Sequence, residues 1–192
     1  MTTPFLFGYG SILWRQDFLP VSIRPAMLAG YQRALAQRST DHRGTEARPG
    51  IVATLLHAPD HQVVGRLFEV SKIDFDRVFT ALNHREKNGY HLIDVDVAVG
   101  SEIVPARTYI APPCNPWYLG QQPIQDLASV IMNAKGPSGS NLDYVLQLFA
   151  ESLALGHVDQ ELADLMTHLL SDDTVVARAN VLGIQCPDAQ GC

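Results

Sequence analysis

The order of the apolar patterns along the chain constrains its fold more than any other feature. Short apolar and β-branched stretches, typical of strands, all fall before about residue 110, at 5–7, 29–38, 51–56, 63–70, 90–99 and 103–110. Apolar residues at helical spacing dominate the last third, after Pro123 and again from Asn141 and Asp159. Strands grouped first and helices grouped last predict an α+β fold, with a mainly antiparallel sheet or small barrel and helices packed outside it.

Turn and capping residues set the expected boundaries of these elements. Residues 58–62 and 100–102 predict two hairpin turns, and a loop is expected up to about Pro25, with Gly30 at the entry of the next strand. Ser71 is a suitable N-cap for a helix that runs to about Lys87 and ends at Asn88 and Gly89. Gly136-Pro137-Ser138-Gly139 predicts a turn, after which Ser140 caps a further helix.

Length and composition predict an ordinary soluble globular protein. The 192 residues suit one domain, expected over 1–192. A net charge of −6 argues against nucleic acid or an anionic membrane as partner, and no apolar run reaches the ~20 residues of a membrane span. Three widely spaced cysteines without a C-x-x-C motif, and a start without a positive segment, predict a cytoplasmic protein. The seven histidines have no metal-binding spacing, so no metal is expected.

A glycine-rich stretch follows the first predicted strand. It reads Phe7-Gly8-Tyr9-Gly10-Ser11-Ile12-Leu13-Trp14. Glycines at positions 8 and 10 permit a positive φ or the close approach of a ligand, and successive N–H groups in such a turn can form a nest for an anion. A substrate carboxylate or an oxyanion would fit such a nest. The alternative is a plain glycine turn between two buried segments.

One carboxylate lies on the apolar face of the predicted helix over 71–87. At ~100° per residue, Phe75, Val78, Phe79 and Leu82 form one stripe, and Glu86 projects within about 20° of Phe75. Arg85 and the other polar residues of this helix fall on the solvent side. Burial and the helix dipole both raise the pKa of such a carboxyl, which suits a general base. The alternative is a solvated Glu86, or one paired with Arg85 or Lys87.

Five separated motifs, spread in order over residues 5–149, together resemble one family. The motifs are Tyr9-Gly10-Ser11-Ile12-Leu13-Trp14, Gln37-Arg38-Ser39-Thr40-Asp41-His42-Arg43-Gly44, His84-Arg85-Glu86-Lys87-Asn88-Gly89-Tyr90, Asn115-Pro116-Trp117-Tyr118-Leu119-Gly120, and Gly136-Pro137-Ser138-Gly139-Ser140-Asn141 with Tyr144. With these motifs, the chain resembles the ChaC-type, glutathione-specific gamma-glutamylcyclotransferases. Ile12-Leu13 stands where the family usually has Leu-Ile, a swap that conserves volume. The last ~40 residues match no motif.

The resemblance implies both a fold and a reaction. The fold is gamma-glutamylcyclotransferase-like, with a small, mainly antiparallel or mixed barrel-like sheet. The reaction converts glutathione, a small-molecule substrate, to 5-oxoproline and cysteinylglycine without a cofactor. Glu86 would be the general acid/base. The implied substrate-binding residues are Tyr9, Gly10, Ser11, Ile12, Arg38, Ser39, Tyr118 and Tyr144.

Several alternatives stay open at this stage. Arg38 and Arg43 could each grip a carboxylate, or form surface ion pairs with Asp41 or Glu46. Tyr118 and Tyr144 could cap a pocket or be ordinary half-buried tyrosines. Cys114 could be a nucleophile, but a structural or incidental role is favoured because no base lies near it in sequence. The reaction could use another γ-glutamyl compound, or the chain could be a non-catalytic module that binds a γ-glutamyl group.

Overall fold

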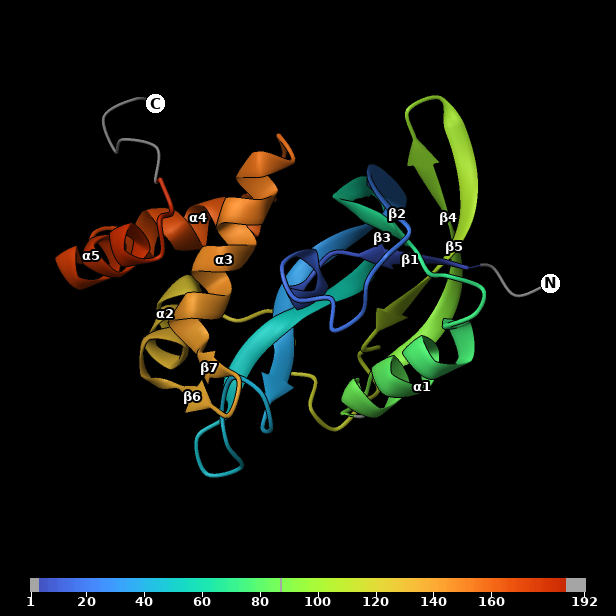
Figure 1. The fold of residues 1–192 in the computed structure, drawn as a ribbon. Coiled ribbons are helices and arrows are strands. Elements are labelled where there is room, and N and C mark those ends of the chain that lie inside the picture. Colours follow the sequence, from blue (N-terminus) through green and yellow to red (C-terminus); the bar gives the residue numbers. More distant parts are fainter. Residues whose placement is uncertain (1–3, 87, 186–192) are drawn as a thin grey trace. The chain divides into compact units, whose positions relative to one another are not determined.

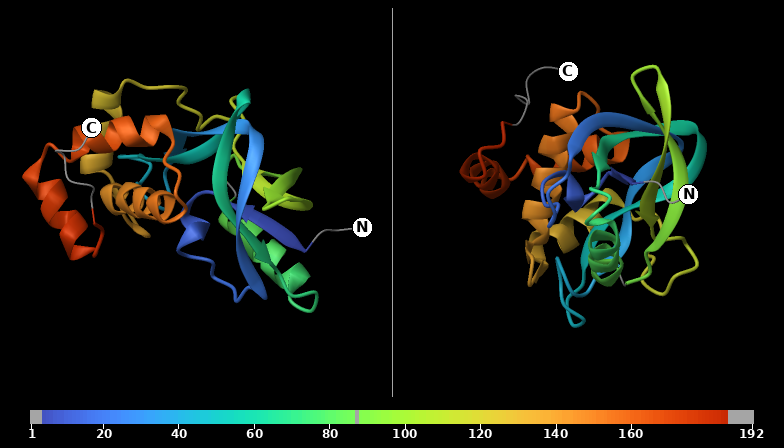
Figure 2. Two further views of the ribbon diagram at one scale, coloured as in Figure 1. Left: turned by 90° about the horizontal axis from the view of Figure 1, so that it is seen from above. Right: turned by 45° about the vertical axis from the view of Figure 1, so that its right-hand side comes forward.

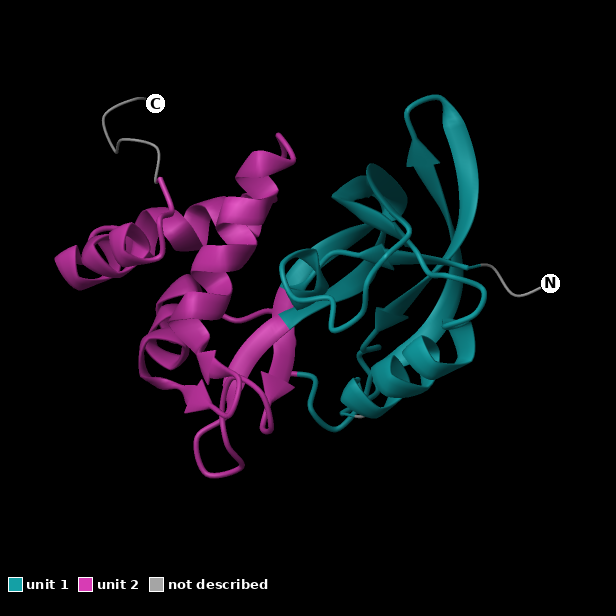
Figure 3. Cartoon of the chain, in the orientation of Figure 1, with its two compact units in different colours: residues 1–34, 53–118 teal, residues 35–52, 119–192 magenta. Residues whose placement is uncertain are grey.

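A computed structural model describes residues 4–86 and 88–185. The chain forms two compact units, residues 1–34 with 53–118 and residues 35–52 with 119–192 (Figure 3). Each unit is described by itself below. The expectation of a single domain over 1–192 stays a prediction. The end of the predicted helix at Lys87 lies outside the described residues.

Five strands form a closed barrel in the order β1-β3-β2-β4-β5 (Figure 1). The strands are β1 Phe5–Gly8, β2 Ser22–Ser39, β3 Gly50–Glu69, β4 His91–Val99 and β5 Glu102–Ile110. β1 pairs antiparallel with β3 and parallel with β5, whereas β4 pairs antiparallel with both β2 and β5. The mixed, mainly antiparallel barrel of an α+β fold is therefore confirmed.

Two strands differ from the sequence prediction. β2 begins at Ser22, so Pro25 and Gly30 lie inside it, and Gly30 adopts a φ of +80° there. β3 is one continuous strand of 20 residues, and the hairpin turn predicted at 58–62 is wrong. Pro59 and its polar neighbours are tolerated because this part of the strand is largely exposed to solvent.

Helix α1 spans Phe75–Arg85 and packs against the barrel strands of its own unit (Figures 1 and 2). Val78, Phe79 and Leu82 join Leu6 and Phe68 in one hydrophobic cluster. The predicted apolar stripe is thus the buried face. The helix is shorter than predicted, since Asp74 rather than Ser71 is its N-cap and Glu86 is its C-cap. Gly89, with a φ of +84°, turns the chain toward β4 as expected.

The second unit is mainly helical. Its helices are α2 Ile124–Asn133, α3 Asn141–Ala154, α4 Gln160–Leu169 and α5 Asp173–Val181. Buried Leu127, Ile131, Leu146, Leu165 and Met166 form its apolar interior. The turn predicted at 136–139 joins two short strands, β6 Lys135–Gly136 and β7 Gly139–Ser140. The Ser140 hydroxyl caps α3 as predicted, accepting the Asp143 N–H at 3.0 Å.

No helix within residues 4–86 and 88–185 combines the length and the apolar character that crossing a bilayer requires.

Asn141, at the start of α3, forms hydrogen bonds through its side chain with the start of β3. Its side chain is fully buried, and its amide accepts the Ile51 N–H at 2.6 Å and donates to the Ile51 carbonyl at 2.8 Å. The Asn141 amide thus pairs with both backbone groups of Ile51, as a residue of a neighbouring strand would. This explains why an asparagine closes the motif Gly136–Asn141.

We predict that Asn141→Ala destabilises the protein strongly. The change leaves two buried backbone groups without partners, and each costs about 1–3 kcal/mol. Urea unfolding monitored by circular dichroism measures the loss. Asn133→Ala is the control, because Asn133 is exposed and bonds only within its own helix, to Ser129. Equal stability of the two variants would contradict the structural role of Asn141.

Glu161 of α4 gives unfolding a pH-dependent component. Its carboxylate accepts the Leu35 N–H at 2.8 Å, and burial raises the pKa of this carboxyl. Because the pKa of Glu161 is higher in the folded than in the unfolded protein, folding favours the protonated carboxyl. Protonated Glu161 therefore contributes its full stabilisation at a pH below the pKa in the unfolded chain. The contribution is lost as the pH rises through the pKa in the folded protein.

We therefore predict that Glu161→Gln, which keeps the acceptor and removes the charge, gains stability over the wild type as the pH rises. The difference in unfolding free energy between the variant and the wild type should grow in favour of the variant as the pH rises above about 4, the usual pKa of a glutamate. Glu46→Gln, in an exposed loop, is the control for the loss of one negative charge. The same pH dependence in both variants would rule out the buried carboxylate as the source of the effect.

Candidate functional site

The loop after β1 folds closely onto the barrel. A Cβ at Gly8 would lie 2.3 Å from Ile12 Cγ2 and 2.7 Å from Phe68 Cε2, so only glycine fits there. The chain then forms a 3-10 turn over Ser11–Leu13, with Gly10 before it at a φ of −117°. Close approach is therefore the reason for Gly8, but the neighbours are the protein's own side chains. A left-handed conformation occurs at neither Gly8 nor Gly10.

The start of this 3-10 turn presents backbone donors. The first N–H groups of a helix have no acceptor within it. The Leu13 N–H donates to the Gly10 carbonyl at 2.9 Å, whereas the N–H groups of Ser11 and Ile12 have no acceptor among residues 4–86 and 88–185. The stretch predicted as an anion nest thus offers two adjacent donors.

Tyr9 follows directly after β1 and makes a contact within the barrel sheet. Its ring is buried, and its hydroxyl donates to the Tyr109 carbonyl at 2.7 Å. The Tyr9 side chain therefore ties β1 to β5.

Glu86 lies at the C-terminus of α1, as expected, and its side chain is 24% exposed. Its N–H still donates to the Leu82 carbonyl at 2.9 Å, but its ψ of 24° departs from helical geometry. The Arg85 Nε lies 3.3 Å from Glu86 Oε1. The pairing with Arg85, which the sequence left open as the alternative to a buried general base, is therefore present.

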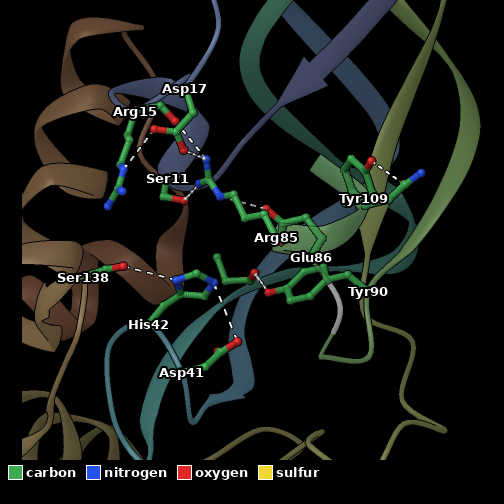
Figure 4. Close-up of polar contacts among 12 residues, drawn as sticks. Ser11, Arg15, Asp17, Asp41, His42, Arg85, Glu86, Tyr90, Tyr109 and Ser138 are labelled. Carbon is green, nitrogen blue, oxygen red and sulfur yellow. Dashed lines mark hydrogen bonds and ion pairs between the residues drawn. The ribbon is translucent and has the colours of Figure 1, made fainter. Parts of the chain in front are cut away.

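Arg85 contradicts its predicted position on the solvent side. Its side chain is only 16% exposed and turns toward the loop after β1 (Figure 4). Nη2 donates to Ser11 Oγ at 2.5 Å, and Nη1 donates to Asp17 Oδ2 at 3.0 Å and to the Arg15 carbonyl at 3.1 Å. Helical periodicity misses these contacts because their partners come from a loop about 70 residues earlier in the chain.

Tyr109 adds a neutral hydroxyl on the same side of the barrel. It donates to Asn83 Oδ1 of α1 at 2.6 Å. Burial first, and then the negative charge of Glu86, raise the pKa of the Tyr109 phenol, so it stays protonated. No sequence motif pointed to Tyr109 or Asn83. The Glu86 carboxylate therefore lies close enough to the Tyr109 hydroxyl for its negative charge to raise the pKa of the phenol.

The polar segment around 37–44 belongs to the second unit. Arg38 is exposed, whereas the buried Ser39 hydroxyl accepts the Arg43 N–H at 3.0 Å. Arg43 is only 7% exposed, so the surface position that one of its two alternatives required is wrong. Its guanidinium lies 5.5 Å from the ring centre of buried Tyr144 and donates to the Ser140 carbonyl at 3.4 Å.

A second polar contact joins this segment to the turn at 136–139. His42 Nδ1 lies 3.2 Å from Ser138 Oγ, and the Ser138 N–H donates to the His42 carbonyl at 2.9 Å. His42 Nε2 is 3.8 Å from Asp41 Oδ2 (Figure 4). The two motifs in this unit, far apart in sequence, therefore pack as one substructure.

The remaining candidates lie in the loop between β5 and α2. Tyr118 is half-buried, and its N–H donates to the Asn115 carbonyl at 3.2 Å. Cys114 is an exposed free thiol. Within the described residues, no three His, Cys, Asp or Glu side chains are grouped as metal ligands would be.

Comparisons with known proteins place the chain among relatives of one kind. It is 34% identical over 194 residues to gamma-glutamylcyclotransferase 2-3 of Arabidopsis thaliana, covering 92% of this chain and 98% of the relative. The human glutathione-specific gamma-glutamylcyclotransferase 1 is 36% identical over 149 residues, covering 75% of this chain and 67% of that protein.

A solved structure agrees with these relatives. The crystal structure of a yeast gamma-glutamyl cyclotransferase specific to glutathione superposes with a TM-score of 0.79 at 26% identity, covering 87% of this chain and 95% of that one. The model of the ChaC-like protein family matches residues 4–172, so the similarity extends past the last motif recognised in the sequence. The chain belongs to the ChaC-like protein family.

Proposed function

We propose that this protein is a gamma-glutamylcyclotransferase that cleaves glutathione to 5-oxoproline and cysteinylglycine. Its relatives carry that activity in their names, and it belongs to their family. One structural observation carries the proposal furthest: within one unit, the Arg85 side chain joins the Ser11 loop to Glu86. A donor loop and a candidate base held together in this way suit acyl transfer.

The reaction needs little from the protein beyond positioning and proton transfer. The α-amine of the γ-glutamyl group attacks its own γ-carbonyl carbon, a C–N bond forms, and a five-membered ring closes. The bond from that carbon to the cysteine nitrogen then breaks. Because the attack is intramolecular, orientation supplies several kcal/mol of the acceleration.

Glu86 is the proposed general acid/base. The attacking amine arrives as an ammonium and loses a proton, and the leaving amine gains one. A single carboxylate does both in sequence, accepting the first proton and returning it to the cysteine nitrogen. Such catalysis is typically worth ~10²–10⁴-fold in rate. The contact with Arg85 supports this role, because the same guanidinium bonds Ser11 and so holds the Glu86 carboxylate near the donor loop.

The N–H groups of Ser11 and Ile12 are the proposed donors to the oxyanion of the tetrahedral intermediate. Gly10 and Tyr9 would then contribute through their backbone, since the Tyr9 hydroxyl already bonds the Tyr109 carbonyl. Ser11 is not proposed as a nucleophile, since no nucleophile-elbow motif surrounds it.

The substrate's free carboxylates call for positive charge on an otherwise acidic protein. Arg38, which is exposed, is the proposed receptor for one of them. Ser39, Tyr118 and Tyr144 are proposed at the substrate site by family resemblance alone. For Ser39 and Tyr144, their contacts with Arg43 support an indirect role, in shaping the segment that presents Arg38. No nucleic acid or membrane partner and no cofactor is proposed, and the cytoplasmic location stays a prediction from the cysteine pattern.

We predict that Glu86→Gln lowers kcat for glutathione by at least ~10²-fold, because the proton shuttle is lost. Substrate affinity and the melting temperature should stay close to wild type, since glutamine has nearly the same shape. Release of 5-oxoproline, measured by chromatography, gives the rate.

Asp76→Asn is the matched control, as another acid-to-amide change on α1 at an exposed position. It should leave turnover unchanged. A Glu86→Gln variant that keeps most of its activity would remove Glu86 from the mechanism.

The substrate class is tested with a panel of γ-glutamyl compounds. We expect the highest kcat/KM with glutathione, and lower values with γ-glutamyl dipeptides and γ-glutamyl-lysine. A preference for another member of the panel would keep the reaction and change the substrate. Binding of glutathione without release of 5-oxoproline would instead identify a non-catalytic module.

A further inference from the structure

Arg85 has contacts that neither a surface arginine nor a substrate receptor would need. It is the last residue of α1, yet it reaches the loop after β1 and is mostly covered (Figure 4). Arg77, on the same helix, shows the ordinary alternative: it is exposed and bonds Asp74 one turn earlier, with Nη2 2.7 Å from Oδ1.

The donors of Arg85 are almost fully used within the protein. Nη1 bonds two oxygens, the Arg15 carbonyl and Asp17 Oδ2, while Nη2 bonds Ser11 Oγ and Nε faces Glu86 Oε1. A guanidinium has five N–H groups, of which three make these hydrogen bonds, while Nε lies 3.3 Å from the Glu86 carboxylate. Two carboxylates also flank its charge. Arg85 is therefore not built to bind a carboxylate of the substrate.

The bond from Arg85 has a consequence for Ser11. A hydroxyl has one proton to donate, and Ser11 Oγ already accepts the Nη2 proton at 2.5 Å. Its own proton must then point to a different acceptor. Receiving a hydrogen bond from a cation also makes a hydroxyl a stronger donor. The Ser11 hydroxyl can thus donate a hydrogen bond beside the N–H groups of Ser11 and Ile12, at the start of the same 3-10 turn.

Asp17 binds the Arg85 guanidinium through the nitrogen that does not contact Ser11. It has a φ of 56°, the one positive φ recorded for a non-glycine residue within the described chain. Its carboxylate binds Arg15 Nε at 3.3 Å through Oδ1 and Arg85 Nη1 at 3.0 Å through Oδ2. A left-handed aspartate is uncommon, and here it presents both oxygens to cations. Asp17 thereby fixes the position of the guanidinium.

We infer that Arg85 is a positioning residue, which orients the Ser11 hydroxyl as a third oxyanion donor and holds Glu86 beside the same loop. This inference rests on the proposed cyclotransferase function. Arg85 acts through Ser11 and Glu86 and does not touch the reacting atoms. Its interactions serve the transition state, so its loss affects kcat rather than KM.

The test is Arg85→Lys, because an ammonium keeps the charge but cannot bond Ser11, Asp17 and Glu86 in one plane. We expect kcat for glutathione to fall about 10- to 100-fold, the usual effect of slight misplacement. KM should stay within about threefold of wild type, as expected when only transition-state interactions are lost. Arg77→Lys is the matched control, and both of its constants should be unchanged. A rise in KM without a fall in kcat would overturn the inference, since it would make Arg85 a substrate receptor.

A double variant tests the link to Ser11. If Arg85 acts through the hydroxyl, Ser11→Ala and Arg85→Lys together should lower kcat by much less than the product of their separate effects. A product of the two effects would overturn the link. If Arg85→Lys does not fold, Asp17→Asn replaces it, because asparagine accepts the left-handed backbone while removing one anchoring charge. A folded Asp17→Asn variant with wild-type kcat would then overturn the inference.

The wild-type assay separates this inference from the proposed function. A wild-type protein that releases no 5-oxoproline from any γ-glutamyl compound overturns both. An active wild type together with a fully active Arg85→Lys variant overturns the inference alone.

Discussion

The packing of α1 against the barrel is the constraint on which the rest of the first unit depends. Val78, Phe79 and Leu82 bury their side chains against Leu6 and Phe68, and each such burial is worth about 1.5–3 kcal/mol. The cluster joins β1, β3 and the helix, and Ile12 of the glycine loop packs on its edge. Because the helix cannot shift without opening this cluster, its packing fixes the position of Arg85 and Glu86 beside the loop after β1.

The electrostatics at this helix end are a compromise. The helix dipole favours a cation at the C-terminus, as Arg85 supplies, and disfavours the carboxylate of Glu86. Placing the two side by side, with Asp17 on the far side of the guanidinium, compensates the unfavourable charge. Neutral Tyr109 completes the surroundings without adding charge, since burial and Glu86 both raise its pKa. Glu86 is thus paired with a cation while remaining partly covered.

The sequence correctly predicted those features of the fold that depend on neighbouring residues alone. The hairpin of β4 and β5, the capping of α3 by Ser140 and the left-handed Gly89 all follow from local residue preferences, and all are present. The turn predicted at 58–62 failed because Pro59 and its neighbours sit on an exposed part of β3. There, polar residues and proline do not interrupt a strand whose neighbours in the barrel are β1 and β2.

The candidate site was harder to predict, because its contacts are long-range. Helical periodicity gave the buried face of α1 correctly up to Leu82, but the helix ends at Arg85, where a wheel with ~100° steps stops being valid. The partner of Arg85 lies 74 residues away in sequence, and no spacing rule encodes it. Within the glycine motif, the tyrosine faces the barrel and the serine faces Arg85. Two conspicuous residues of one motif thus make different contacts, and only the three-dimensional structure separates the tyrosine that bonds β5 from the serine that bonds Arg85.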